Sequence, residues 1–297
     1  MRCAATSAAR TIVAMKRLQV LPASAGLQTR PRRGATAQSL LNTVLGEFVY
    51  PRERAAWTHA LIRGLKLFRI DEAAVRQALA RSASVGLLDR EQEGRRVRWR
   101  MSKTTERMRE EGGRRLYTFR SGRTDWDGKW LLLSVIVPDD RRRLLLRRRL
   151  AWAGFGILPT GLAISPHVER EAEARRVLEF LGLEKEALSF VATLDTIGAS
   201  SRMIRSAWDL DALALRYENF VAQLRTQRPR TGEDLFVAIT WLVHEWRRFL
   251  YVDPGLPVEV LPAQWIGLEA KDVFDRHYAK WRPGAARWFA AVNGESV

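Results

Sequence analysis

Three side chains near residue 80 are of the types that read DNA base edges. Arg76, Gln77 and Arg81 lie in the segment from Ile70 to Gly86. An arginine can donate two hydrogen bonds to O6 and N7 of guanine, and a glutamine can pair with N6 and N7 of adenine. If this segment is a helix that enters a major groove, these residues predict base contacts. The alternative is that they are ordinary solvated side chains on an exposed helix face.

A second group of cations follows this segment. A turn at Glu93-Gly94 leads into a run in which strand alternation places Val97, Trp99 and Met101 on one face. The other face then carries arginines only. We expect these arginines, together with the first arginine after the turn, to contact phosphates. Such contacts contribute to DNA affinity more than to sequence specificity. They are Arg95, Arg96, Arg98 and Arg100.

The elements that must position these residues can also be predicted. Asp71 is a suitable N-cap for the helix and Gly86 a suitable stop. Helical spacing predicts an earlier helix over residues 38–50, ended by Pro51, and a short helix that has Thr58 as its N-cap. A linking helix is expected over residues 103–117. The order of helix, helix, recognition helix and hairpin is that of a winged helix-turn-helix.

The net charge is concentrated in this part of the chain. Residues 1–123 contain 26 Lys and Arg against 10 Asp and Glu, whereas residues 124–297 contain 24 against 23. The formal charge of +17 therefore lies almost entirely in the first two-fifths of the sequence. Such segregation predicts one half that binds a polyanion and another half with a different task.

The fold class predicted for the whole chain is α+β. A pattern of strand, helix, two strands, helix and strand from Trp130 to Leu194 is typical of a ferredoxin-like βαββαβ domain. Three apolar helical stripes follow, and Pro283 is expected to interrupt the last of them. We expect a basic, disordered arm and three domains. Their limits are 1–36, 37–123, 124–198 and 199–297.

Size and composition restrict the class of protein further. With 297 residues and 46% hydrophobic content, the chain can bury a substantial core, and no apolar run approaches the ~20 residues of a membrane span. The single cysteine, Cys3, excludes a disulfide framework and a zinc cluster. We therefore expect a cytoplasmic, nucleoid-associated protein with no membrane contact.

Several short motifs, taken together, resemble the PaaX family of bacterial transcriptional repressors over nearly all of residues 38–290. The recognition helix is also similar to that of the GntR group through its Val-Arg-Gln-Ala-Leu core, residues 75–79. The PaaX motifs occur in order through the middle and last domains. They are Trp126-Asp127-Gly128-Lys129-Trp130, Leu150-Ala151-Trp152-Ala153-Gly154-Phe155-Gly156, Ser165-Pro166, Asp253-Pro254-Gly255-Leu256-Pro257 and Leu261-Pro262-Ala263-Gln264-Trp265.

The PaaX resemblance implies a winged helix, a Cas2-like ferredoxin fold and a helical C-terminal domain. It also implies a homodimer that binds operator DNA, represses an aromatic-acid catabolic operon and is released by an aromatic acyl-CoA, typically phenylacetyl-CoA. No cofactor, metal or catalytic residue is expected, and the chain is not expected to be an enzyme.

An aromatic acyl-CoA needs an apolar pocket and cations for its phosphates. One set of aromatic and basic side chains, mostly in the last domain, offers both, although the tryptophans could equally be core residues. These candidates are Trp152, His244, Trp246, Arg247, Arg248, Tyr251 and Trp265.

Other functions remain open from the sequence. Asp139 and Asp140 follow the first strand of the Cas2-like domain, where they could serve a metal-dependent nuclease or simply cap the next helix. The arginines at 141–143 and 147–149 form a solvated face or contact phosphates. A DNA-binding regulator without any ligand is the third possibility.

Overall fold

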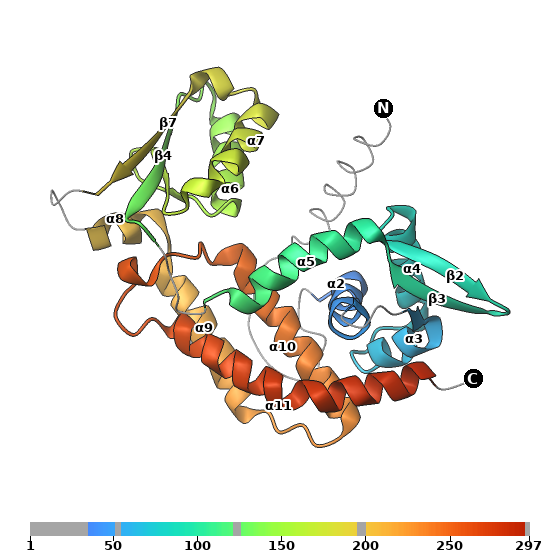
Figure 1. Cartoon of the computed structure of the whole chain (residues 1–297). Helices are drawn as coiled ribbons and strands as arrows, with labels where there is room; N and C mark the ends of the chain where they lie inside the picture. Colours follow the sequence, from blue (N-terminus) through green and yellow to red (C-terminus); the bar gives the residue numbers. More distant parts are fainter. Residues whose placement is uncertain (1–34, 51–54, 121–125, 195–199, 295–297) are drawn as a thin grey trace. The chain divides into compact units, whose positions relative to one another are not determined.

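The computed structural model describes residues 35–50, 55–120, 126–194 and 200–294. The expected N-terminal arm, apart from its last two residues, and the expected stop at Pro51 lie outside the described residues. Contacts divide the chain into two compact units, whose elements are drawn in Figure 1. Unit 1 combines Met1–Tyr117, Gln223–Trp246 and Phe274–Val297, and unit 2 combines Thr118–Ala222 and Arg247–Val273.

Unit 1 begins with the predicted order of elements. The first two helical segments are α2 (Ala37–Val44) and the π-helical turn η1 (Leu45–Val49), after which β1 (Ala56–Trp57) leads into α3 (Thr58–Lys66). The helix predicted to be the recognition helix is α4 (Glu72–Ser84), and the hairpin consists of β2 (Leu88–Glu93) and β3 (Arg96–Met101). Helix α5 (Lys103–Thr118) follows the hairpin.

The prediction that Thr58 caps α3 was wrong. The N-cap is Trp57, which makes no side-chain cap hydrogen bond. The Thr58 hydroxyl is used instead by the hairpin, because it donates to the Val97 carbonyl (2.8 Å) and accepts from the Trp99 indole (2.9 Å). This pair of hydrogen bonds joins the start of α3 to β3.

Unit 1 has one aromatic core to which both ends of the chain contribute. The Phe48 ring of η1 lies 4.9 Å from Phe236 in α10 (Gly232–Val252) and 5.4 Å from Phe289 in α11 (Ile266–Gly294). Phe68, in the turn after α3, also packs against Phe236 and against Trp241 of α10. The helices that precede the hairpin therefore share their core with the C-terminal helices.

A buried carboxylate lies beside this core. Glu47 of η1 is 2% exposed, and its carboxylate accepts hydrogen bonds from Tyr117 of α5 (2.9 Å), Tyr278 of α11 (2.6 Å) and Arg282 of α11 (2.8 Å). Burial raises the pKa of Glu47 above its ordinary value, while the two tyrosines and the arginine oppose this rise. The cluster ties η1 to α5 and α11.

Helix α11 differs from the prediction that Pro283 would interrupt it. The helix runs from Ile266 to Gly294 with Pro283 inside it. A proline removes one backbone hydrogen bond, but apolar residues before and after it are buried. Trp281, Ala285 and Phe289 are each at most 3% exposed, so packing on both sides of Pro283 maintains the helix.

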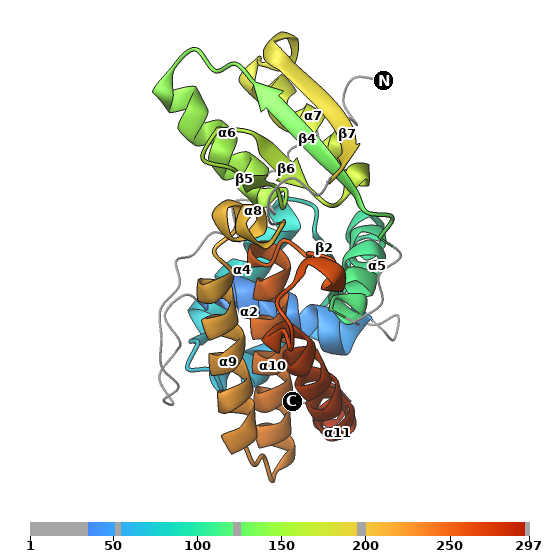
Figure 2. The ribbon, with the colours of Figure 1, turned by 90° about the vertical axis from the view of Figure 1, so that its left-hand side faces the viewer.

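Unit 2 contains the ferredoxin-like arrangement. Its sheet has the order β5-β6-β4-β7, and all neighbouring strands are antiparallel. Helices α6 (Asp140–Trp152) and α7 (Glu171–Leu181) lie side by side on one face of this sheet, as Figures 1 and 2 show. The strands are β4 (Lys129–Val135), β5 (Gly156–Ile157), β6 (Ala163–Ser165) and β7 (Ala187–Thr193). The predicted βαββαβ order is confirmed by this topology.

Helices α8 (Ser200–Ala207) and α9 (Leu210–Thr226) follow the sheet along the chain. In the part of the chain that the structure describes, no helix combines the length and apolar character needed to cross a membrane.

Two of the motifs that carry the family resemblance have structural roles in unit 2. A Cβ atom at Gly156 would lie 2.6 Å from the Trp208 ring, so the strand leaves no space for a side chain there. Asp253 is buried and pairs with the equally buried guanidinium of Arg120, which also donates to the Leu256 carbonyl (2.6 Å). The Tyr217 hydroxyl donates to the same carboxylate. The buried ion pair between Arg120 and Asp253 therefore stabilises the loop that contains the Asp-Pro-Gly motif.

The Glu47 cluster yields a pH-dependent prediction. We expect Arg282→Met to lower the free energy of unfolding by about 3 kcal/mol at pH 8, because the buried carboxylate loses its cation. In this variant the folded-state pKa of Glu47 should rise further. The free energy of unfolding should therefore fall as the pH rises from about 4.5 through that pKa, and it should be partly recovered when the pH is lowered to about 5. Urea unfolding at both pH values measures the effect.

The double variant Glu47→Gln with Arg282→Met is the matched control, since it has no carboxyl group to titrate at this position. It should lack the recovery at low pH. Equal unfolding free energies of Arg282→Met and the unaltered protein at pH 8 would contradict the role assigned to the cluster.

Candidate nucleic-acid interface

Helix α4 is held by its buried face and exposes the predicted reading residues. Val75, Ala78, Leu79 and Ser82 are buried, and Ser82 accepts a buried hydrogen bond from Gln38 of α2 (2.7 Å). The predicted N-cap is confirmed, since Asp71 accepts from the Ala74 amide (2.7 Å). The helix ends at Ser84, and Gly86 follows in the left-handed conformation (φ 73°), as a helix stop requires.

The three candidate base-reading side chains are all exposed. Arg76 pairs with Glu72 one turn earlier at 2.7 Å, and both side chains are more than half exposed, so this pair is worth little energy and can open. The side chains of Gln77 and Arg81 make no hydrogen bond or ion pair with the described residues. They are four positions apart and therefore project from one face of α4.

The hairpin has the predicted alternation of faces. Trp99 and Met101 are buried and Val97 is half-buried, whereas Arg96, Arg98 and Arg100 point to the other side. β3 lies between β1 and β2, and Arg96 and Arg98 lie over the Trp57 ring of β1 at 5.9 and 5.8 Å. The arginine face is thus fixed by a sheet of three strands.

The neighbouring strand places a carboxylate opposite each of these arginines, a pairing that was not predicted from the sequence. In the register of β2 and β3, Asp89 faces Arg100, Glu91 faces Arg98 and Glu93 faces Arg96. Glu91 accepts hydrogen bonds from Arg98 (2.8 Å) and Arg100 (3.0 Å), and Arg98 also lies 3.4 Å from Glu93. The hydrogen bond from Arg100, assisted by Arg98, lowers the pKa of Glu91. This face is consequently close to neutral rather than cationic.

Other cations near α4 and the hairpin are not paired in this way. Arg95 is exposed at the hairpin turn, where Gly94 has φ 60°, and Arg90 is exposed on β2. Neither side chain has a hydrogen bond or ion pair within the described part of the chain, which is also true of Arg81. Arg95 and Arg81 were predicted from the sequence, whereas Arg90 was not, because it lies in a strand with three acidic residues.

The candidate effector residues are divided between the two units. In unit 1, Trp246 is fully buried and donates its indole N–H to the Leu116 carbonyl (3.1 Å), and His244 Nδ1 lies 3.3 Å from the Thr43 hydroxyl. In unit 2, the half-exposed Trp152 stacks on Tyr251 with ring centroids 5.8 Å apart.

The other unit 2 candidates are more enclosed. Trp265 is buried against Tyr217, and Arg247 and Arg248 are half-buried. Trp152 and Tyr251 are therefore the pair of candidates that forms an aromatic surface.

The two aspartates considered for a nuclease have other partners. Asp139 is the N-cap of α6, where it accepts from the Arg142 amide (2.8 Å), and Asp140 pairs with Arg143. Among the described residues, no three His, Cys, Asp or Glu side chains gather as a metal site would require. The interpretation of Asp139 as a helix cap is confirmed.

The fold and the exposed face of α4 define a class of protein in which a helix-and-hairpin unit is combined with a ferredoxin-like unit. Models of one family match the chain in sequence order. They are the PaaX-like protein (residues 36–105), the PaaX protein central Cas2-like domain (123–204) and the PaaX-like protein C-terminal domain (208–291). The chain belongs to the PaaX family.

Two individual proteins show the same likeness. The chain is 29% identical to the transcriptional repressor PaaX of Escherichia coli (strain K12) over 269 residues, which is 87% of this chain and 84% of that protein. A solved structure, the uncharacterized protein Rv0674 from Mycobacterium tuberculosis, is similar with a TM-score of 0.57 at 23% identity, over 86% of this chain and 98% of the other. The second likeness concerns the fold alone.

The carboxylates opposite the hairpin arginines predict the effect of removing one of them. We expect Glu91→Gln to tighten binding to duplex DNA of any sequence, because Arg98 and Arg100 lose the carboxylate that they share. The slope of log K against log salt concentration should become steeper by about 1, the value for one additional phosphate contact. Fluorescence anisotropy of a labelled duplex over a range of salt concentrations measures both quantities.

Glu233→Gln on α10 makes the same change in net charge outside the hairpin and serves as the control. It should leave the slope unchanged. If both variants altered affinity equally, net charge rather than the hairpin would be responsible.

Proposed function

We propose that this protein is a sequence-specific, DNA-binding transcriptional repressor of a phenylacetate-type catabolic operon. The observation that carries the proposal is the exposed face of α4, where Gln77 and Arg81 lie beside Arg76 on a helix fixed by a buried face. The likeness to a transcriptional repressor over most of both chains supports it. In this role the protein acts in the cytoplasm and catalyses no reaction.

The roles of the side chains follow from their chemistry and exposure. Arg76, Gln77 and Arg81 contact base edges in the major groove, where arginine suits guanine and glutamine suits adenine. The hairpin cations contact phosphates and set the orientation on the duplex. Arg95 is available in the present arrangement, whereas Arg96, Arg98 and Arg100 must exchange a carboxylate or an aromatic contact for a phosphate.

Regulation is proposed to act on a homodimer. Two recognition helices separated by ~34 Å match successive major grooves, and an effector that favours another arrangement releases the DNA. The proposed effector is an aromatic acyl-CoA, with phenylacetyl-CoA as the first candidate. The stacked pair of Trp152 and Tyr251, together with Arg247 and Arg248, is the proposed contact in unit 2.

Alanine substitutions on α4 test the reading face. We expect Gln77→Ala and Arg81→Ala each to weaken operator binding by about 1–3 kcal/mol and to relax the preference at one base pair, because each removes a bidentate base contact. The operator is obtained first by sequencing genomic DNA recovered with the protein. Gel shifts with operator and scrambled duplexes then give the ratio of specific to non-specific affinity.

Arg107→Ala on α5 is the matched control, since Arg107 is an exposed arginine of the same unit outside the reading face. Its ratio of specific to non-specific affinity should equal that of the unaltered protein. A reading face on α4 is excluded if the ratio stays the same in the α4 variants as well.

A titration with acyl-CoA thioesters tests the regulatory part. We expect saturating phenylacetyl-CoA to weaken operator binding at least tenfold, which requires a preference of about 1.4 kcal/mol for the non-binding arrangement. Acetyl-CoA and free coenzyme A should have little effect, because they share the adenine ring but lack the phenyl ring of the acyl group that is proposed to stack on the aromatic surface. Operator occupancy that is the same with all three compounds would contradict release by an aromatic effector.

A further inference from the structure

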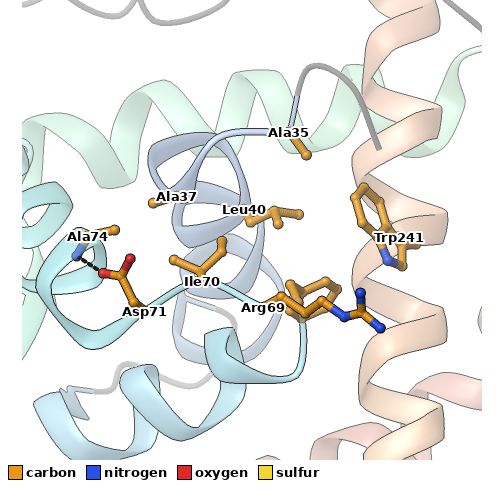
Figure 3. A pocket seen from close by; sticks show the side chains of 9 residues that line it. Ala35, Ala37, Leu40, Arg69, Ile70, Asp71, Ala74 and Trp241 are labelled. Carbon is orange, nitrogen blue, oxygen red and sulfur yellow. Dashed lines mark hydrogen bonds between the residues drawn. The ribbon is translucent and has the colours of Figure 1, made fainter. Parts of the chain in front are cut away.

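A cavity of about 250 Å³ lies in unit 1 at the turn between α3 and α4 (Figure 3). One wall is aromatic, since the buried Phe68 ring and the half-buried Trp241 indole pack edge to face with centroids 5.6 Å apart. Aliphatic side chains of α2 and of the turn complete the apolar part, and the rim carries two charged groups. The lining residues used below are Leu40, Phe68, Arg69, Ile70, Asp71 and Trp241.

Arg69 occupies a backbone conformation that arginine seldom adopts. Its φ is 59°, in the left-handed region, and the amides of Arg69 and Ile70 donate to the carbonyls of Lys66 (2.9 Å) and Leu65 (3.4 Å). This is the pattern of a Schellman motif, in which glycine is the usual residue at the left-handed position. A side chain there costs on the order of 1 kcal/mol, and such strain points to a use for the side chain.

The guanidinium of Arg69 is available to a ligand. It is exposed, makes no hydrogen bond or ion pair with the described residues, and lies beside Trp241 at one end of the cavity (Figure 3). The Asp71 carboxylate points away toward the Ala74 amide, to which it is hydrogen-bonded. The cavity is half open to solvent and combines an aromatic wall and aliphatic side chains with polar atoms of the turn. At the Trp241 end it carries the guanidinium of Arg69, a cation without a partner among the described residues.

From this lining we infer that the cavity binds a small aromatic carboxylate, with the ring between Leu40, Ile70 and the aromatic wall and the carboxylate on Arg69. The volume is below the ~300 Å³ at which pockets for drug-sized molecules begin, so it suits one ring and not a coenzyme A thioester. A planar guanidinium pairs with a carboxylate through two parallel hydrogen bonds. The site is distinct from the residues proposed above for the acyl-CoA.

Occupation of this cavity would act on the recognition helix directly. Ile70 and Asp71 immediately precede α4, and Ala74 in its first turn also lines the cavity. A ring placed against these residues contacts the start of the helix that carries Gln77 and Arg81. This regulatory consequence rests on the proposed function, whereas binding of the ligand does not.

Fluorine NMR of 4-fluorobenzoate and 4-fluorophenylacetate, titrated with the full chain in the absence of DNA, tests the binding. We expect saturable line broadening with both acids and none with 4-fluorobenzamide, which has the ring but no charge. Arg69→Gly should weaken binding at least tenfold, because it removes a charge-assisted pair, while its glycine fits the left-handed position at least as well. This variant should therefore unfold at the same temperature as the unaltered protein or higher.

Two further variants make the result specific to the cavity. Lys66→Ala removes an exposed cation from the same helix end outside the lining and should leave the affinity unchanged. Asp71→Asn retains a good N-cap residue and removes the negative charge at the rim, so it should tighten binding of both acids. An affinity that is equal in Arg69→Gly and the unaltered protein, or the absence of saturable broadening, overturns the inference.

A gel shift with the operator in the presence of either acid tests the regulatory consequence. Bound acid should change operator affinity in the unaltered protein and not in Arg69→Gly, and an unchanged affinity at saturating acid would overturn this part. Failure of the proposed function is a separate result, since it would appear as non-specific DNA binding by the unaltered chain with no acid present.

Discussion

The buried carboxylate of Glu47 is the constraint on which the organisation of unit 1 depends. An ion of this kind costs several kcal/mol to remove from water unless hydrogen bonds and an opposite charge compensate it. Its partners are Tyr117 of α5, which is 70 residues away in sequence, and two residues of α11, which are more than 230 residues away. The chain can bury Glu47 only by bringing these helices onto η1, which explains why η1, α5 up to Tyr117 and the part of α11 from Phe274 onward lie in one compact unit. The aromatic core around Phe48 adds the hydrophobic contribution to the same arrangement.

The charge pairs across the hairpin reduce the positive charge that this strongly basic part of the sequence presents on its surface. Each arginine of β3 that points away from the core has a carboxylate of β2 opposite it. A phosphate that binds there must displace a partner already in place, so the gain in free energy from these contacts is reduced. Non-specific binding to DNA is mainly electrostatic and suffers most from this loss. In the proposed function, base contacts by α4 would then form a larger share of the binding free energy, which favours discrimination between sequences over attraction to any duplex.

Much of this fold could be predicted because it depends on local periodicity. The spacing of Val75, Leu79 and Ser82 was sufficient to predict α4 and its exposed face, and the alternation after Gly94 was sufficient to predict β3. The features that could not be predicted depend on partners distant in sequence. Thr58 does not cap α3 because its hydroxyl is hydrogen-bonded to Trp99 and Val97. Pro283 does not end α11 because the residues on both sides of it are buried. The role of Glu91 could not be predicted from the sequence, because its pairing with Arg98 and Arg100 depends on the register between β2 and β3.

The two ends of α4 are held to the rest of the unit with different strength. In its last turn, the buried hydrogen bond from Gln38 to Ser82 anchors the helix to α2, and breaking it would leave polar groups unsatisfied in the core. At its first turn, the helix follows a strained left-handed residue and borders a cavity. Displacement is therefore less costly at the start of the helix than at its end. The helix has 13 residues and spans roughly 20 Å at ~1.5 Å per residue, so a tilt about the Ser82 anchor moves its N-terminal half most. Gln77 lies in that half and Arg81 lies beside the anchor, so a change at the turn would displace Gln77 more than Arg81.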